Sequence, residues 1–215
     1  MNSATALRGL YAITDPALCP DAGLETQVAQ ALAGGCRVIQ FRDKGEDRER
    51  RRRLAAGLVA LCERQEALLI VNDDIELARE VGAHGVHLGR DDGDPAAARA
   101  LLGERAVIGA SCYNRLDLAL EAAANGVDYV AFGRFFPSTT KPDAVQATPD
   151  LLRRARAALA LPLVAIGGIT PENGAPLIAA GADMLAVVHG VFGQPDIRAA
   201  CRRLCTLFEL KETRV

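Results

Sequence analysis

Several features are missing from this 215-residue sequence, and each absence argues against one class of protein. No stretch approaches the roughly 18 apolar residues of a membrane-spanning helix. Residues 1–8 lack the basic-then-apolar pattern of a secretion signal, which favours a cytoplasmic location. The formal net charge is only −2, so no general attraction to nucleic acid is expected. These absences do not decide whether the chain associates with itself, so a homo-oligomer stays open.

Paired cysteines of the metal-binding type are also missing. The six cysteines contain no C-x-x-C pair and only three histidines accompany them, which argues against a zinc site. In a chain with no secretion signal, buried and reduced thiols are the better interpretation. Cys112 stands apart from the others because it adjoins a polar strand end.

Eight short apolar segments alternate with Ala-rich helical segments. In a repeated unit, such as residues 78–88, a helix ends at Gly, and a tight turn leads into a buried strand. The expected strands are Gly9–Ile13, Val38–Phe41, Leu68–Val71, Gly85–Leu88, Val107–Ala110, Tyr129–Phe132, Leu163–Ile166 and Met184–Val188. Eight such units in slightly over 200 residues predict an α/β fold, a single (β/α)8 TIM barrel.

A doubly wound open sheet is the alternative fold. It usually carries a Gly-rich phosphate loop after its first strand, but this chain continues there with Thr14, Asp15 and Pro16. No linker or low-complexity segment interrupts the sequence, so residues 1–215 are expected to form one domain. The basic run 48–53 is expected to lie on the solvated outer face of the second helix.

The segment 38–44 begins as an apolar strand and ends in charge. Gln40, Arg42 and Lys44 share one face by the two-residue period of a strand, whereas Ile39 and Phe41 share the other. In a barrel, the polar face would point to the mouth, where active sites form, and would suit a multiply charged anion. The alternative is a strand end that frays into a solvated loop.

Acidic residues follow two neighbouring strands. Asp73 and Asp92 could supply two carboxylates with an open face, which suits Mg²⁺. The alternative is helix capping, by Asp73 or Asp74 for the helix that begins at Ile75, and by Asp92 or Asp94 for the next. Doubled acids allow one residue to cap and the other to bind metal.

Further cations and small residues complete a rim of polar strand ends. Arg42, Lys44 and Lys141, together with Mg²⁺, could neutralise a pyrophosphate. Residues 167–168 (Gly-Gly) would permit a phosphate to approach the backbone after the seventh strand, and the hydroxyls of residues 138–140 could reach either anion.

No nucleophile with a partner base is evident. His87 lies in an apolar strand and is expected to be a satisfied core histidine, and Ser111 has no obvious base beside it. Stabilisation of a departing leaving group therefore fits these residues better than covalent catalysis.

The ordered motifs resemble those of the thiamine-phosphate synthase family over nearly the whole chain. They are GLYAITD (9–15), QFRDK (40–44), VNDD (71–74), GVHLGRDD (85–92), IGAS (108–111), FPSTTK (136–141) and VAIGGI (164–169). The resemblance implies a Mg²⁺-dependent transferase that joins a pyrimidine methyl diphosphate to a thiazole phosphate. It also implies a dissociative mechanism, in which pyrophosphate leaves and the thiazole nitrogen captures the pyrimidine cation.

The resemblance also implies roles for individual residues. Asp73 and Asp92 would hold Mg²⁺. The pyrimidine diphosphate would be bound by Gln40, Arg42, Lys44, Asn72, Ser111 and Lys141. The thiazole phosphate would be surrounded by Ser138, Thr139, Thr140, Gly168, Val188 and His189.

This sequence departs from the family pattern at three positions. His189 stands where many members have a Ser that contacts phosphate, and it could donate a hydrogen bond there. Thr139 replaces a common Lys, and Asp43 replaces a common Glu.

Three alternatives remain on the same fold. A thiazole tautomerase would not need the metal and pyrophosphate site. A Schiff-base aldolase would use Lys141 or Lys44 as its nucleophile. A non-catalytic phosphate-binding barrel would bind ligand without turnover.

Overall fold

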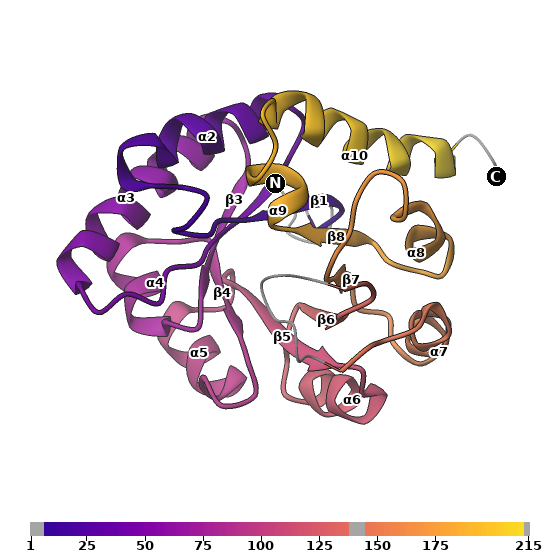
Figure 1. The fold of residues 1–215 in the computed structure, drawn as a ribbon. Coiled ribbons are helices and arrows are strands. Elements are labelled where there is room, and N and C mark those ends of the chain that lie inside the picture. Colours follow the sequence, from indigo (N-terminus) through magenta and orange to yellow (C-terminus); the bar gives the residue numbers. More distant parts are fainter. Residues whose placement is uncertain (1–6, 138–144, 213–215) are drawn as a thin grey trace.

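Eight parallel strands close into a barrel in the computed structural model, which describes residues 7–137 and 145–212 (Figure 1). Each strand pairs with the next in sequence, and β8 pairs with β1 to close the ring. The strands are β1 Gly9–Ile13, β2 Val38–Phe41, β3 Leu68–Asn72, β4 Gly85–Leu88, β5 Val107–Tyr113, β6 Tyr129–Gly133, β7 Leu163–Ile166 and β8 Met184–Val187. The expected (β/α)8 barrel is confirmed, with small differences at four strand ends.

Helices form the outer ring around the barrel (Figure 1). They are α2 Asp21–Ala33, α3 Arg48–Arg64, α4 Ile75–Val81, α5 Pro95–Leu102, α6 Leu116–Ala124, α7 Pro149–Ala158, α8 Ala175–Ala179, α9 His189–Phe192 and α10 Ile197–Glu212. The short α9 directly follows β8 and lies at the front of Figure 1, so that view faces the end where the strands finish. Helix α10 packs against α2 and α8 and covers the outside of β1.

Local sequence signals begin and end the helices. Asp47, Asp74 and Asp94 accept hydrogen bonds from the first backbone amides of α3, α4 and α5, respectively. Gly82 ends α4 with a φ of 68°. Apart from its two chain neighbours, no atom of the described residues lies within 4 Å of where its Cβ would be, so this left-handed backbone conformation alone favours glycine.

The buried side chains form two layers that follow the alternation of the strands. Ile39 and Phe41 belong to the layer between sheet and helices, as expected. Val38 belongs to the layer inside the barrel, which is filled around Tyr11 and Tyr129. Gln40 also lies on the inner side, where its amide donates to the Tyr11 hydroxyl. Gln40 therefore lies inside the barrel, whereas Arg42 and Lys44 follow the end of β2.

The expectation of a wholly solvated basic run was wrong for two of its residues. Arg52 pairs with Glu49 at the surface of α3. Arg50 and Arg51 instead turn toward acids of the strand-end loops, where they pair with Asp43 and Asp74. Successive helical residues point in directions about 100° apart, so only part of the run can face solvent.

The cysteines are free thiols, as expected. All but Cys205 are buried. Within residues 7–137 and 145–212, no helix combines the length and the apolar composition needed to cross a membrane.

Candidate active site

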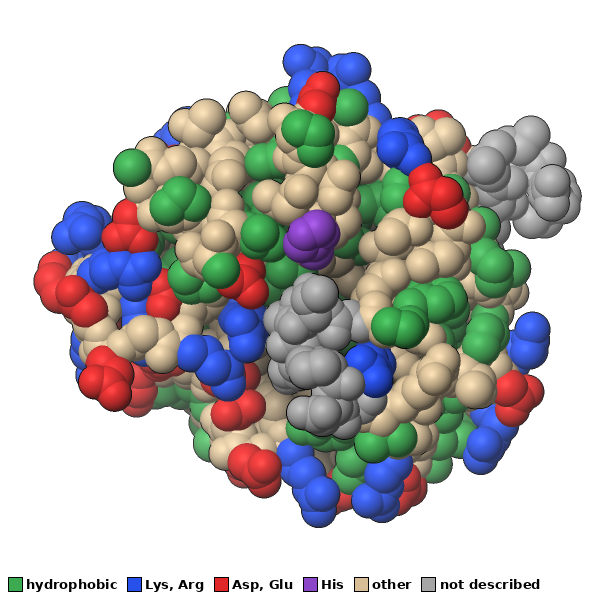
Figure 2. Space-filling model, in the orientation of Figure 1, with side chains coloured by type: hydrophobic (Ala, Val, Ile, Leu, Met, Phe, Trp, Pro, Cys, Tyr) green, Lys and Arg blue, Asp and Glu red, His purple; other side chains and the backbone are tan. Residues whose placement is uncertain are grey.

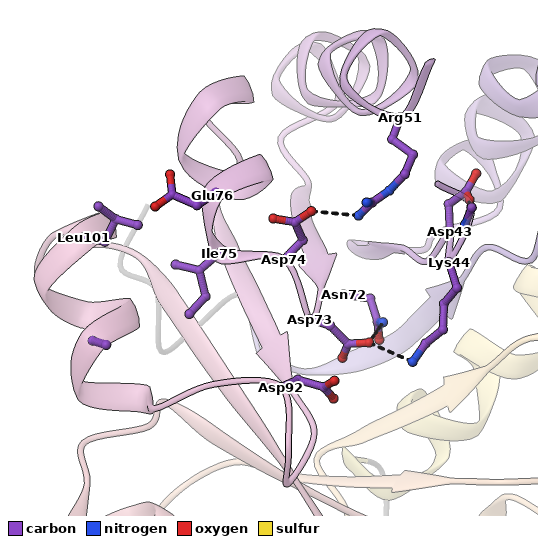
Figure 3. A pocket seen from close by; sticks show the side chains of 12 residues that line it. Asp43, Lys44, Arg51, Asn72, Asp73, Asp74, Ile75, Glu76, Asp92 and Leu101 are labelled. Carbon is purple, nitrogen blue, oxygen red and sulfur yellow. Dashed lines mark hydrogen bonds and ion pairs between the residues drawn. The ribbon is translucent and has the colours of Figure 1, made fainter. Parts of the chain in front are cut away.

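A cavity of about 600 Å³ opens where β2, β3 and β4 end (Figure 3). Four of the residues singled out from the sequence line it: Lys44, Asn72, Asp73 and Asp92. The cavity continues outward over the start of α4 and along α5, where Leu101 forms part of its wall. Acidic and basic side chains stand close together on this side of the molecule (Figure 2).

Asp73 is the centre of the polar contacts in the cavity. Its Oδ2 accepts a hydrogen bond from the Asn72 amide at 2.5 Å and lies 3.1 Å from Lys44 Nζ. The backbone of Asp73 has a φ of 65°, a left-handed conformation that Asp and Asn tolerate better than most residues. This turn, immediately after β3, aims the carboxylate into the mouth and not along the strand.

Asp92 brings a second carboxylate to the same place. Its side chain lies beside that of Asp73 (Figure 3), and its Oδ2 accepts the Gly89 amide at 3.1 Å. Burial raises the pKa of Asp92, and the neighbouring Asp73 carboxylate raises it further. Two adjacent carboxylates, one of them paired with Lys44, form a hard-oxygen donor set that suits a divalent cation such as Mg²⁺.

The doubled acids divide two tasks, as the sequence allowed. Asp74 accepts from the Leu77 amide at 2.9 Å and caps α4, while its other oxygen pairs with Arg51. Asp94 caps α5 by accepting from the Ala96 amide. Asp73 and Asp92 cap neither helix and line the cavity, together with the capping residue Asp74, whereas Asp91 is not part of the lining.

Asp43 anchors the loop that carries Lys44, a role that the sequence did not reveal. Its side chain is 4% exposed; one oxygen accepts the Gly45 amide at 2.8 Å and the other pairs with Arg50 at 2.7 Å. Arg50 also donates two hydrogen bonds, from Nε and Nη2, to the carboxylate of Asp21 at the start of α2. The sequence signal for this contact is the spacing of Asp43 and Gly45, because an Asp side chain commonly accepts a hydrogen bond from the backbone amide two residues later.

Gln40 and Ser111 lie deeper, at opposite ends of a set of hydrogen bonds inside the barrel. His87 sits between them and has a partner on each ring nitrogen, Tyr129 on Nδ1 and Ser111 on Nε2. The expectation of a satisfied core histidine is confirmed. The expectation that Ser111 has no base beside it was wrong, because the pairing of β4 with β5 brings His87 within 2.9 Å of its hydroxyl. Arg42 is half-buried, and its backbone amide donates to the Thr14 hydroxyl, which ties the end of β2 to β1.

Three of the residues expected to bind a thiazole phosphate are described, and they lie at the ends of β7 and β8, outside the cavity lining: Gly168, Val188 and His189. Gly168 has a φ of 63°, and a Cβ there would lie 2.3 Å from the Pro137 carbonyl oxygen. Val188 precedes α9, and His189 begins that helix as an exposed residue. The remaining expected residues lie outside the described residues: Ser138, Thr139, Thr140 and Lys141.

Comparisons with known proteins agree on one family. The family model described as thiamine monophosphate synthase matches residues 10–191. The thiamine-phosphate synthase of Thioalkalivibrio sulfidiphilus is 54% identical over 95% of this chain and 97% of its own length, and that of Nitrosococcus oceani is 53% identical over 91% and 90%. A solved thiamine phosphate pyrophosphorylase from Pyrococcus furiosus superposes with a TM-score of 0.88 at 34% identity, over 97% of this chain and 98% of its own. The chain therefore belongs to the thiamine monophosphate synthase family.

Proposed function

We propose that this protein transfers the 4-amino-2-methyl-5-pyrimidinylmethyl group from its diphosphate to a thiazole phosphate, which yields thiamine phosphate and pyrophosphate. We further propose Mg²⁺ as the cofactor, the whole chain as one barrel domain and the cytoplasm as its location. One observation carries the reaction: the carboxylates of Asp73 and Asp92 and the ammonium of Lys44 share one cavity at the strand ends.

The carbon–oxygen bond to the diphosphate breaks heterolytically in this reaction. The electron pair leaves with pyrophosphate, and the resulting pyrimidinylmethyl cation accepts the lone pair of the thiazole nitrogen. No proton has to move in either step, so the reaction needs the cations and carboxylates at the mouth and does not require Ser111 and His87 to act as nucleophile and base.

Each group at the mouth has a task in that scheme. Asp73 and Asp92 would hold Mg²⁺, which as a Lewis acid would neutralise charge on the departing pyrophosphate. Lys44 would leave its ion pair with Asp73 and contact the diphosphate. The diphosphate would also be contacted by Arg42, Asn72 and Lys141. The thiazole phosphate site would be formed by Gly168, Val188, His189 and residues 138–140.

Product formation tests this proposal. Purified protein is given the pyrimidine diphosphate and the thiazole phosphate, and pyrophosphate and thiamine phosphate are measured with Mg²⁺ and again with excess EDTA. We expect release that requires both substrates and the metal. Omission of either substrate is the control. Folded protein that releases nothing with Mg²⁺ would refute the proposal, and turnover that persists in EDTA would refute its metal part.

A further inference from the structure

A continuous line of hydrogen bonds crosses the interior of the barrel below the mouth. Gln40 Nε2 donates to the Tyr11 hydroxyl at 2.7 Å, and that oxygen lies 2.8 Å from the Tyr129 hydroxyl. Tyr129 lies 2.9 Å from His87 Nδ1, and His87 Nε2 lies 2.9 Å from Ser111 Oγ. The line joins β2 to β5 through residues that are distant in sequence. Its two ends are residues assigned to the pyrimidine diphosphate.

The interior holds this line rigidly. Tyr11 and Tyr129 are 1% and 0% exposed, and their rings meet edge to face with centroids 5.9 Å apart. The His87 ring stacks on Tyr129 at 5.6 Å. Burial raises the pKa of both tyrosines, so both hydroxyls keep their protons. Gly109 makes room, because a Cβ there would lie 2.0 Å from Cζ of Tyr129.

Donor and acceptor chemistry fixes the direction of the line. An amide nitrogen can only donate, so Tyr11 accepts from Gln40. A buried hydroxyl proton needs an acceptor, and Tyr129 is the partner of Tyr11 that can accept, so we take Tyr11 as the donor to Tyr129. Tyr129 in turn donates to His87 Nδ1, which must then be unprotonated. The ring proton sits on Nε2 and is donated to Ser111 Oγ. The hydroxyl proton of Ser111 is not used by the line and is left for another acceptor.

We propose that Tyr11, Tyr129 and His87 form a positioning network that holds His87 as the neutral Nε2–H tautomer and thereby makes Ser111 a hydrogen-bond donor to the diphosphate. The role of Ser111 as a substrate contact rests on the proposed function; the tautomer rests on the structure alone. An anionic diphosphate needs donors, and a serine hydroxyl that already accepts from histidine is a polarised donor. His87 acts through Ser111 and touches no substrate.

The first test is the tautomer itself. Nitrogen-15 NMR of the free protein labelled at histidine gives a small set of signals, since the chain has three histidines. His87→Asn identifies the signals of His87 by their loss. We expect a protonated Nε2 and an unprotonated Nδ1 for His87. Tyr129→Phe, which removes the hydroxyl that donates to Nδ1, should let the other tautomer appear. A protonated Nδ1 in the unmodified protein would overturn the proposal.

The second test is coupling between His87 and Ser111 in turnover. The side chain of Gln can place an amide N–H near the position of His Nε2, whereas Asn is too short, so His87→Gln and His87→Asn form a matched pair. We expect His87→Asn to lower kcat/KM by about tenfold or more, the cost of weakening one hydrogen bond to a charged group. His87→Gln should restore most of that loss.

In a Ser111→Ala background, His87→Asn should cost less than about twofold, because its route to the substrate is gone. An equal loss with and without Ser111 would show that His87 acts independently and would overturn the proposal. Failure of the proposed function is distinguishable: an unmodified protein without turnover that still shows the Nε2–H tautomer would refute the reaction and leave the tautomer standing.

Discussion

Replacing Gly109 with Ala would push a methyl group into the ring of Tyr129. The added Cβ would lie 2.0 Å from Cζ and 2.4 Å from both Cε atoms of Tyr129. Carbon atoms in contact stay about 3.5 Å apart, so the ring has to retreat by about 1.5 Å. Tyr129 has little space for this, because it is fully buried beside Tyr11 and His87.

The energetic cost has two parts. Overpacking of a filled interior costs about 1–3 kcal/mol. The shift would also break at least one of the hydrogen bonds of 2.8 and 2.9 Å that end on the Tyr129 hydroxyl, and one buried group left unpaired costs about 1–3 kcal/mol. We therefore expect Gly109→Ala to lower the free energy of unfolding by about 2–6 kcal/mol and the Tm by about 5–20 °C.

A second glycine provides the matched control. A Cβ at Gly23 in α2 would meet its nearest atom at 3.8 Å, which is ordinary contact, and the backbone there is helical. Gly23→Ala should therefore raise the free energy of unfolding by about 0.5–1 kcal/mol. Both variants are compared by urea denaturation followed by circular dichroism. A Gly109→Ala protein as stable as the unmodified one would refute the interior packing described above.

Three further outcomes are expected. Lys44→Met should raise KM for the pyrimidine diphosphate. The free energy of unfolding should change by less than about 1 kcal/mol, because Lys44 is 60% exposed in its pair with Asp73. A larger loss of stability in a denaturation experiment would show that Lys44 has a structural role. Asp43→Asn should keep the Gly45 contact but leave Arg50 without its buried partner. We expect the free energy of unfolding to fall by about 1–3 kcal/mol and the KM for the pyrimidine diphosphate to rise, with Asp91→Asn as the surface control. Unchanged values in both assays would argue against the anchoring role. Burial raises the pKa of Cys112 to about 12, so the thiol stays protonated and enclosed at pH 8. A thiol reagent should therefore label Cys112 only after denaturation. Rapid labelling of Cys112 in the native protein, detected by peptide mass analysis, would contradict this.

The sequence predicted those features that depend on local pattern. Strand period and Gly stops located all eight strands, and the two-residue alternation placed Ile39 outside and Gln40 inside the barrel. The doubled acids allowed one residue to cap a helix and the other to bind metal. Asp74 caps α4, because a capping residue lies immediately before its helix, and Asp73 lines the cavity beside it, where metal binding stays a prediction.

Features that depend on the closed barrel could not be predicted. Tyr11 and Tyr129 are 118 residues apart, and their contact requires the ring to close at a particular register. Arg50 joins Asp43 to Asp21 because α2 and α3 pack side by side, which no local pattern encodes. The outward reach of the cavity to Leu101 likewise follows from the packing of α4 against α5.

We propose that Asp73 and Asp92 hold a divalent cation at the mouth of the barrel, and a metal titration measures whether they do. Mn²⁺ can replace Mg²⁺ as a spectroscopic probe, because both prefer oxygen ligands. Electron paramagnetic resonance of a Mn²⁺ titration, with inorganic pyrophosphate present, would count the bound ions. We expect one ion per chain, lost in Asp92→Asn and retained in Asp91→Asn. Equal binding by the two variants, or no binding by the unmodified protein, would contradict the claim.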